Sequence, residues 1–442
     1  MPSSSPPPRP GRAAAARDRL RRWEPVIRAF VAVDDDAWSR LDTADGPLGG
    51  VAVGVKDVVD ARGLPTRNGS AAFADVPPAA DDAPVVAALR RAGAAIVGKT
   101  TSTEFAFVDP TDTRNPHAAS HTPGGSSSGS GAAVGAGVLD LAVATQTAGS
   151  LCRPAAYCGA VGFKPGHGRL PMQGVSPLSV SFDTVGFIGR DVALVRAAWQ
   201  AAADGPATSA VDPGAGAAAG PGAGAGAGTA ADATAAERPA IGLAVTDPAA
   251  PMTDAVLAAR AGAAQAASAL GFPVADAVAR LDFAAIVADH RRVMLHEAAR
   301  AHAHLLATAA NRLRPLFAAA LREGLGISAA DADAARSRLR DVRERFWDAM
   351  SAFDLLLACP VPATAPPCRG GGTGYQHLLT PWTVFGGPLL CLPWGADADG
   401  LPLSVMLAGP PGGEARVLAV GAALAPLAPP LPAPSPERAG AA

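Results

Sequence analysis

Two clusters of small residues carry hydroxyl groups suited to acyl transfer. The first is a Gly/Ser run over residues 124–130, and the second is the QTAGS segment over residues 146–150. Ser126 and Ser150 stand 24 positions apart, one in each cluster. Small residues let backbone and ligand approach closely, and serine hydroxyls beside free backbone N–H groups supply a nucleophile and an oxyanion site. The apolar run over residues 132–144 is expected to be buried and to hold both clusters rigidly.

A serine nucleophile needs a base, and the sequence offers a lysine rather than a histidine. No histidine lies within three residues of Ser150, whereas Lys56 ends an apolar, strand-like run over residues 51–55. Burial disfavours the charged ammonium, so a buried lysine becomes able to accept a proton. Successive strand side chains alternate between faces, so Asp57 is expected to point away from Lys56. Ser126 would then bridge Lys56 and Ser150; the alternative for Lys56 is a strand-end side chain that reaches solvent.

Two other motifs offer competing interpretations. Residues 93–100 match the Walker A pattern, but the intervening residues AAIV favour a strand over a phosphate-binding loop. Residues 125–129 match GxSxG, which would make Ser127 the nucleophile of an elbow. An elbow follows directly on a strand, whereas turn-forming residues precede this motif. Both matches are therefore interpreted as by-products of a larger, composite pattern.

The composite pattern resembles the signature of one enzyme family. Its parts, in chain order, are GVKD at 54–57, GGSS at 124–127, TAGS at 147–150, RPAAYCG at 153–159 and GFKP at 162–165. In this order and spacing they resemble the amidase signature family of serine hydrolases. The triple serine and the QT-x-GS turn are similar to those of bacterial malonamidase-like amidases. The resemblance extends along most of the chain, leaving out residues 1–16, about 205–236 and the tail after Ala425.

The resemblance implies a role for each motif. It implies a Ser-cisSer-Lys triad, with Ser150 as nucleophile, Lys56 as base and Ser126, after a cis bond, as the proton bridge. It implies no metal or cofactor. It also implies an oxyanion hole formed by the backbone of Thr147, Ala148 and Gly149. Substrate contacts are implied for Arg153 and Gly125. Ala148 stands where glycine is commoner but keeps its N–H. Arg153 has two interpretations: it grips a substrate carboxylate, or it pairs inside the scaffold.

Strand and helix patterns place these motifs in an α/β fold. A strand over 51–55, a helix over 84–91 and a strand over 94–97 give the alternation typical of an α/β sheet. A further helix is predicted over 18–30, with Pro25 kinking or splitting it. Other helices are predicted over 252–270, 284–309 and 329–353, and other strands over 240–245, 355–358, 389–392 and 403–407. We expect a single large domain with a mixed central β-sheet covered by helices, the architecture that the resemblance implies.

Composition narrows the classes of function. Lys and Arg number 37 against 39 Asp and Glu, a net charge of −2, which gives no reason to expect nucleic acid or an anionic membrane as a partner. No run of 18 strongly apolar residues predicts a membrane-spanning helix. Five cysteines without a CxxC pair favour a reducing, cytoplasmic location. Four histidines of one predicted helix lack the HExxH spacing of a zinc site and are expected to be packed or exposed: His290, His296, His302 and His304.

The predicted domain boundaries follow composition. Residues 1–16 are rich in Pro, Ser and Ala without an apolar signal core, and are predicted to be a disordered segment. The amidase domain is predicted over 17–425, with an Ala/Gly/Pro low-complexity insertion at about 205–236. Residues 426–442 are predicted to be a disordered Pro/Ala-rich tail.

These observations predict an amidase that splits the C–N bond of a small carboxamide through a seryl acyl-enzyme, giving a carboxylate and ammonia or an amine. The small-molecule amide is the expected partner, and a homodimer is compatible with the sequence. One alternative is a glutaminase-like subunit of an amidotransferase, which would need partner chains. The other is a GxSxG esterase with Ser127 as its nucleophile.

Overall fold

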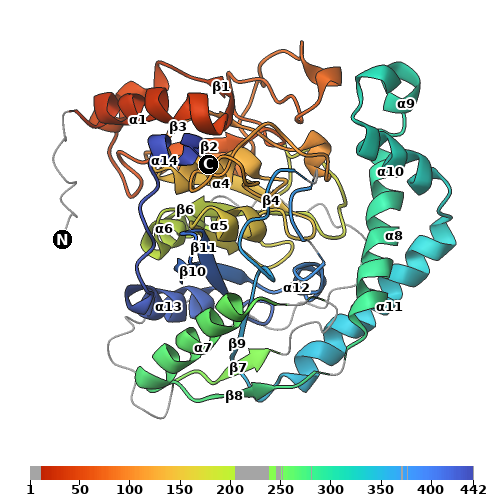
Figure 1. The fold of residues 1–442 in the computed structure, drawn as a ribbon. Coiled ribbons are helices and arrows are strands. Elements are labelled where there is room, and N and C mark those ends of the chain that lie inside the picture. Colours follow the sequence, from red (N-terminus) through yellow and green to blue (C-terminus); the bar gives the residue numbers. More distant parts are fainter. Residues whose placement is uncertain are drawn as a thin grey trace.

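A single mixed sheet runs through the protein. The computed structural model describes residues 11–204, 238–244, 250, 252–279, 281–369, 372–375 and 377–441. Within these ranges eleven strands pair in the order β1–β3–β2–β4–β6–β5–β10–β11–β9–β7–β8 (Figure 1). The strands are β1 (Phe30–Val33), β2 (Ala52–Lys56), β3 (Ala95–Thr100), β4 (Leu141–Gln146), β5 (Val161–Lys164), β6 (Thr184–Gly189), β7 (Ile241–Ala244), β8 (Val274–Ala277), β9 (Leu355–Ala358), β10 (Leu389–Ala396) and β11 (Pro402–Ala408).

Helices cover both faces of this sheet. One face packs against α3, α6, α7 and α13, and the other against α1, α4, α5, α8, α11 and α12. The helices are α1 (Arg12–Ile27), α2 (Arg40–Thr43), α3 (Pro84–Arg91), α4 (Ser128–Gly135), α5 (Cys152–Tyr157), α6 (Val192–Ala203), α7 (Asp254–Ala269), α8 (Phe283–His302), α9 (Leu305–Thr308), α10 (Pro315–Leu325), α11 (Ala329–Ala349), α12 (Thr380–Val384), α13 (Glu414–Leu424) and α14 (Pro436–Ala441). The predicted α/β domain with a mixed, helix-covered sheet is confirmed.

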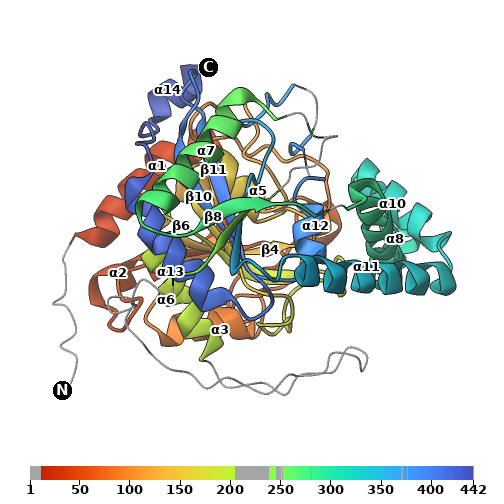
Figure 2. The ribbon, with the colours of Figure 1, turned by 90° about the horizontal axis from the view of Figure 1, so that it is seen from below.

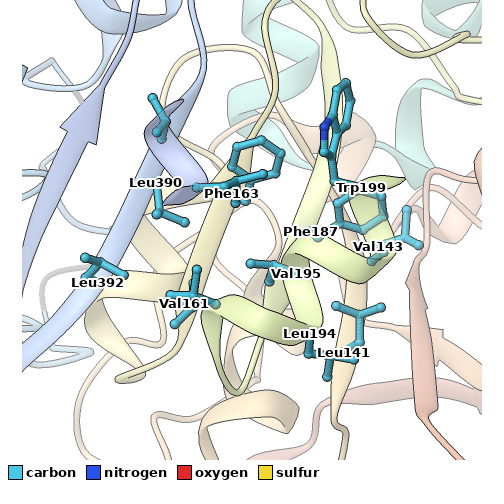
Figure 3. Packing of buried hydrophobic residues seen from close by; sticks show 14 of the residues in the cluster. Leu141, Val143, Val161, Phe163, Phe187, Leu194, Val195, Trp199, Leu390 and Leu392 are labelled. Carbon is cyan, nitrogen blue, oxygen red and sulfur yellow. The ribbon is translucent and has the colours of Figure 1, made fainter. Parts of the chain in front are cut away.

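The environment of strand β4 explains why its sequence is a continuous apolar run. Leu141 and Val143 point into the core shared with α6, and Ala142 and Ala144 point into the core on the opposite face. Figure 3 shows the first of these cores, where the side chains of the central strands meet Leu194, Val195 and Trp199 of α6. A strand buried on both faces reads as a continuous hydrophobic run because neither set of alternate side chains meets water.

Parallel pairing brings two chemically important strand ends together. Strand β2 pairs in parallel with β4, and Val53 lies opposite Leu141. The carboxyl ends of parallel strands lie at the same edge of a sheet. Lys56, the last residue of β2, and Gln146, the last residue of β4, therefore lie at one edge, where each strand passes into a loop.

Glycines bring helix α4 close to its neighbours. A Cβ on Gly129 would lie 2.2 Å from the carbonyl oxygen of Ala29, and one on Gly131 would lie 2.8 Å from the side chain of Pro154 in α5. Any larger residue at these positions would push α4 away. The Gly/Ser cluster is thus fixed by close packing rather than left as a flexible linker.

Three helices form an arm beside the sheet, which we call the helical arm: α8, α10 and α11. They stand together at one side of the molecule in Figures 1 and 2. Leu295 of α8 and Phe317 and Leu321 of α10 are buried in a separate small core, which also contains Phe105 from the loop after β3. The arm is therefore packed against the loops at the edge of the sheet where Lys56 lies.

The structure corrects several predicted boundaries. Helix α1 begins at Arg12, so the disordered segment predicted over 1–16 is too long, and α1 continues past Pro25 to end at Ile27 without splitting. The Asp42 carboxylate accepts the backbone N–H groups of Arg12 and Ala13, which caps the start of this helix. In the tail predicted to be disordered, α14 buries Ala439, whose carbonyl oxygen accepts the N–H of Ala119. The low-complexity insertion at 205–236 lies outside the described residues.

Other differences concern elements that the sequence pattern did not separate. The helix predicted over 284–309 is two helices, α8 and α9, and α10 follows them. Strand β8 was not predicted either; its exposed middle residues, Ala275 and Asp276, give it no apolar pattern. Within the described ranges, no helix combines the length and apolar character that crossing a membrane requires.

Candidate active site

Lys56 is buried at the end of β2 and touches two hydroxyl groups. Its Nζ lies 2.6 Å from Ser126 Oγ and 2.7 Å from Thr145 Oγ1. The side chain is 0% exposed, so it does not reach solvent as the alternative interpretation required. Burial lowers the pKa of Lys56 to about 7, an effect that the nearby Asp183 opposes and Arg153 reinforces. Lys56 is therefore a lysine that can give up and accept a proton near neutral pH.

Ser126 and Ser150 lie in adjacent turns on the carboxyl side of Lys56. The Gly125–Ser126 peptide bond is cis, and the Ser126 carbonyl oxygen accepts the N–H of Thr103 at 3.1 Å. Ser150 stands between β4 and α5, and its carbonyl oxygen accepts the N–H of Ser127 at 3.1 Å. Lys56 and Ser126 are 0% exposed and Ser150 is 7% exposed. Ser150 is thus the member of this set that is most open to an incoming substrate.

Ser127 does not have the geometry of a nucleophile elbow. Its side chain is 0% exposed, and its Oγ donates to the carbonyl oxygen of Thr145 at 3.3 Å. It precedes α4, but a loop rather than a strand leads into it. An elbow nucleophile must present its hydroxyl at a strand–turn–helix junction, so the structure contradicts the GxSxG esterase alternative.

The Walker A match is a strand. Residues 95–100 form β3, and Lys99 is buried with its Nζ 3.7 Å from the Asp57 carboxylate. This ion pair also confirms that Asp57 points away from Lys56. A phosphate cradle needs the glycine-rich segment in a loop before a helix, so no nucleotide site is indicated here.

The segment Thr147–Ser150, here called the oxyanion turn, links β4 to α5. Gln146 supports it from below, because its Oε1 accepts the N–H groups of Leu151 and Cys152 at 3.1 and 3.0 Å. The Thr147 hydroxyl donates to Asp183 Oδ1 at 2.5 Å. Burial raises the pKa of Asp183 to about 6, while the hydrogen bonds from Thr147 and from the backbone of Ser179 and Leu178 lower it. The turn is thus anchored through both side chains and backbone.

Arg153 lies next to the oxyanion turn and forms no ion pair with an acidic side chain among the described residues. Its guanidinium donates to the Gly125 carbonyl oxygen, to Thr373 Oγ1 at 3.3 Å and to the Tyr375 carbonyl oxygen at 3.5 Å. Arg153 is 2% exposed, and its Nε has no hydrogen-bond partner within the described part of the chain. Burial lowers the pKa of Arg153 to about 10, against the attraction of nearby Tyr157. A buried guanidinium with an unpartnered donor is suited to bind an anion.

The three histidines of α8 and His304, which precedes α9, form no metal site among the described residues. Among the described residues no group of three or more His, Cys, Asp or Glu side chains is arranged to hold a metal ion. His296 and His302 are packed against backbone carbonyl oxygens, and His304 is exposed, as predicted. His290 is packed as well, but its partner is the Thr147 carbonyl oxygen of the oxyanion turn, at 2.8 Å. Sequence reasoning missed this contact because the two residues are 143 positions apart.

Comparison with known proteins assigns the class of this site. The chain is similar along most of its length to enzymes that break or transfer amide C–N bonds. Residues 15–418 match the Amidase family model, so the chain belongs to the amidase signature family. A serine-based mechanism is typical of that family, and the resemblance stated from the motifs is confirmed.

Individual relatives include an amidotransferase subunit and enzymes named as an amidase and a hydrolase. One subunit of the glutamyl-tRNA(Gln) amidotransferase of Synechococcus is 32% identical over 462 residues, covering 92% of this chain and 91% of the relative. The peptide amidase of Stenotrophomonas maltophilia has a TM-score of 0.78 and 26% identity, covering 96% of this chain and 94% of that one. A 6-aminohexanoate cyclic dimer hydrolase has a TM-score of 0.81 and 25% identity, covering 96% and 95%.

Proposed function

We propose that this protein hydrolyses the carboxamide of a small substrate through Ser150, with Ser126 and Lys56 moving the proton. The observation that carries the proposal is the buried contact of 2.6 Å between Lys56 Nζ and Ser126 Oγ. Burial lowers the pKa of Lys56 to about 7, so much of the lysine is neutral near pH 7 and its nitrogen lone pair is free to take a proton.

Acylation begins when Ser150 Oγ attacks the amide carbon. The Ser150 proton moves to Ser126, and the Ser126 proton moves to Lys56, while the carbonyl electron pair moves onto its oxygen. N–H groups of the oxyanion turn stabilise that charge. Collapse of the tetrahedral intermediate breaks the C–N bond, and a proton returns from Lys56 through Ser126 to the leaving nitrogen. Ammonia or an amine departs, and an ester to Ser150 remains.

Deacylation repeats the sequence with water as the nucleophile. Water gives a proton to the same Ser126–Lys56 path as its oxygen bonds to the ester carbon. The second tetrahedral intermediate breaks the C–O bond to Ser150, which takes back a proton. The net reaction consumes one amide and one water, and gives one carboxylic acid and one amine or ammonia. The residues return to their starting protonation state, as a catalytic cycle requires.

Arg153 and Gly125 are proposed to set the substrate's position. The Arg153 guanidinium is buried, pairs with no carboxylate in the part of the chain that the structure describes, and lies next to Gly125. A short amide that also bears a carboxylate would find a matching cation there. Two parallel hydrogen bonds between guanidinium and carboxylate fix a ligand's orientation as well as its charge. A Cβ on Gly125 would lie 2.7 Å from the Thr373 side chain, so this position must stay small.

A second candidate is a glutaminase-like protein that works inside a complex and passes ammonia to a partner. The curated relatives support it: the Synechococcus protein, covered over 91% of its length, is named as one of the subunits of a glutamyl-tRNA(Gln) amidotransferase. Glutamine is also a short carboxamide that carries a carboxylate, so the Arg153 argument holds for it. Under this proposal partner chains would be required, and the chemistry at Ser150 would be unchanged. The curated relatives thus support this second candidate more strongly than the first, and the similarity to a peptide amidase, at 26% identity, supports the first.

The two candidates are separated by ammonia release from the isolated chain. We would incubate the purified protein with glutamine, short monoamide acids, their diamides and peptide amides, and measure ammonia beside a Ser150→Ala control. Turnover of any of these amides by the isolated chain, absent in Ser150→Ala, supports the free-standing amidase. Turnover of glutamine only after partner chains are added supports the partner-dependent glutaminase. Equal ammonia release from Ser150→Ala would overturn both.

A further inference from the structure

Each of three successive carbonyl groups of the oxyanion turn is held by a donor. The Thr147 carbonyl oxygen lies 2.8 Å from His290 Nε2 of α8. The Ala148 carbonyl oxygen accepts from Thr383 Oγ1 of α12 at 2.6 Å, and the Gly149 carbonyl oxygen accepts from the N–H of Arg153 at 3.0 Å. Two of the three donors are side chains of helices that lie far along the chain from the turn. The turn therefore does not hold its own shape alone.

Peptide planarity turns these carbonyl contacts into control over the N–H groups. In a trans peptide the C=O of one residue and the N–H of the next point in opposite directions within one plane. A donor on the Thr147 carbonyl oxygen therefore aims the Ala148 N–H away from itself, and a donor on the Ala148 carbonyl oxygen does the same for Gly149. Within the described ranges no acceptor takes the N–H of Ala148, Gly149 or Ser150. These donors are left free for a ligand.

His290 is built to make one such contact. A carbonyl oxygen can only accept, so Nε2 of His290 carries the hydrogen. The side chain is 3% exposed, and burial lowers its pKa to about 4, which keeps the ring neutral. The centroid of its ring lies 4.3 Å from the centroid of the Phe182 ring. Phe182 directly precedes Asp183, whose carboxylate accepts the Thr147 hydroxyl. Ring packing and hydrogen bond together leave the imidazole little freedom to swing away.

We propose that His290 is a positioning residue for amide hydrolysis: by holding the Thr147 carbonyl oxygen it aims the Ala148 N–H at the oxyanion, and Thr383 does the same for the Gly149 N–H. This inference rests on the proposed function, because it names the donors that stabilise the tetrahedral intermediates formed at Ser150. His290 donates to the turn's backbone and takes no part in proton transfer. Its effect falls on the transition state, where negative charge appears on the substrate oxygen.

The test compares His290→Leu with His290→Gln and with His296→Leu. Leucine fills the site without a donor, whereas the Gln amide can reproduce the Nε2 donor. His296 is the matched control, since it lies on the same helix, is 7% exposed and contacts the Ile327 carbonyl oxygen instead. We expect His290→Leu to lower kcat by about 10- to 100-fold with KM changed little, because removing an oxyanion donor outright costs about 10²–10³. Gln should recover part of the loss, and His296→Leu should keep the wild-type kcat.

Thr383 gives a second pair of variants that changes fewer atoms. Thr383→Val removes the hydroxyl while keeping the shape, and Thr383→Ser keeps the hydroxyl. The hydroxyl also accepts from Gln146 Nε2 at 3.0 Å, so thermal unfolding is measured beside the kinetics. We expect Val, but not Ser, to lower kcat at unchanged KM. A loss in both variants, or a loss explained by unfolding, would overturn the positioning role of Thr383.

Fluorophosphonate labelling of Ser150 tests the same inference without any amide substrate. The phosphonyl oxygen would occupy the same donors, so labelling should slow in His290→Leu and stay at the wild-type rate in His296→Leu. If the wild-type chain is labelled at Ser150 but hydrolyses no amide, the proposed function fails, and the labelling rates still decide the role of His290. Equal labelling rates in wild type and His290→Leu, or equal slowing in both leucine variants, would overturn the inference. Absence of Ser150 labelling in the wild-type chain would overturn both proposals.

Discussion

The catalytic edge of the sheet and the helical arm are built in opposite ways. At the edge, β2, β4, α4 and α5 come from one stretch of the first 157 residues, and their chemistry depends on buried polar groups packed at close range. The arm comes from α8, α10 and α11, which form ion pairs with one another, as Arg291 does with Glu323 at the surface. The two regions meet in the small core around Phe105 and in a buried contact from His290 to the oxyanion turn.

The difference shows that catalytic groups and the groups that hold them need not share a motif. The reacting side chains lie in compact sequence signatures because a strand end and a tight turn must bring them together. The contacts that hold the turn come from the elements that pack against it, and here these include α8 of the arm and α12. Substitutions at the edge should therefore abolish activity, whereas most substitutions in the arm should leave it intact.

The largest effect is expected for Ser150→Ala. Without the nucleophile no acyl-enzyme forms, and loss of a triad nucleophile lowers kcat by about 10⁴–10⁶. Ammonia release from a good substrate, measured with stopped assays over hours, gives the residual rate. Ser127→Ala is the matched control and should stay within tenfold of wild type. If Ser127→Ala is the variant that loses all activity, the assignment of the nucleophile is wrong.

Lys56→Arg is expected to be nearly as damaging, because arginine keeps the charge but does not deprotonate in this pH range. In the wild-type protein kcat should rise with pH through about 7, where Lys56 loses its proton and becomes able to accept one. The sign follows from the base role, since below this pH the protonated ammonium has no free lone pair. A pH–rate profile between 5 and 9 measures this. Substantial activity in Lys56→Arg would place the base elsewhere.

A smaller and more selective effect is expected for Arg153→Met. If Arg153 grips a substrate carboxylate, the variant loses on the order of 2–5 kcal/mol of transition-state binding for a short monoamide acid. The corresponding neutral diamide should lose much less. Values of kcat/KM for the two substrates, with melting temperatures of both proteins, separate the outcomes. Equal losses on acid and diamide would assign Arg153 to the scaffold.

The smallest effect is expected on the arm's surface. Arg291 and Glu323 make two hydrogen bonds of 2.8 Å across α8 and α10, but both side chains are about half exposed. Such pairs contribute about 0–1 kcal/mol to stability, so Arg291→Met should shift the unfolding free energy by no more than that and leave kcat unchanged. A large loss of activity would show that this surface takes part in function, for instance by docking a partner chain.

The sequence singles out Lys56 and Ser126, which the structure brings into contact, because their residue types and their positions coincide, and the catalytic roles of these residues and of Ser150 stay predictions. Lys56 ends a run that is apolar on both faces, and Ser126 and Ser150 lie in glycine-rich turns of recognisable spacing. Arg153 is predicted as a residue near the site but not in its role, because a guanidinium suits a carboxylate and backbone carbonyls alike. The sequence likewise indicates where the chain leaves β4 for a turn, because the apolar run stops at Thr145.

The remaining features depend on contacts that leave no local pattern. The start of α1 is capped by Asp42, which is 30 residues away from Arg12, so composition alone placed the boundary too late. His290 is one of four histidines in a predicted helix, and nothing near it distinguishes it from His296. Only the packing of α8 against the turn selects it. Residues that support a site through tertiary contacts thus cannot be predicted from the spacing of motifs.

The distance along the chain between the oxyanion turn and its supports has a consequence for how the protein is made. Ala148 and Thr383 are 235 residues apart, which at about 5–20 residues per second corresponds to roughly 10–50 s of synthesis. During that interval the ribosome-bound chain already contains Ser150 and Lys56, but not helix α12, which carries Thr383. The Ala148 carbonyl oxygen therefore gains its Thr383 donor only when almost the whole polypeptide has emerged, and a chain that terminates before α12 would lack this contact.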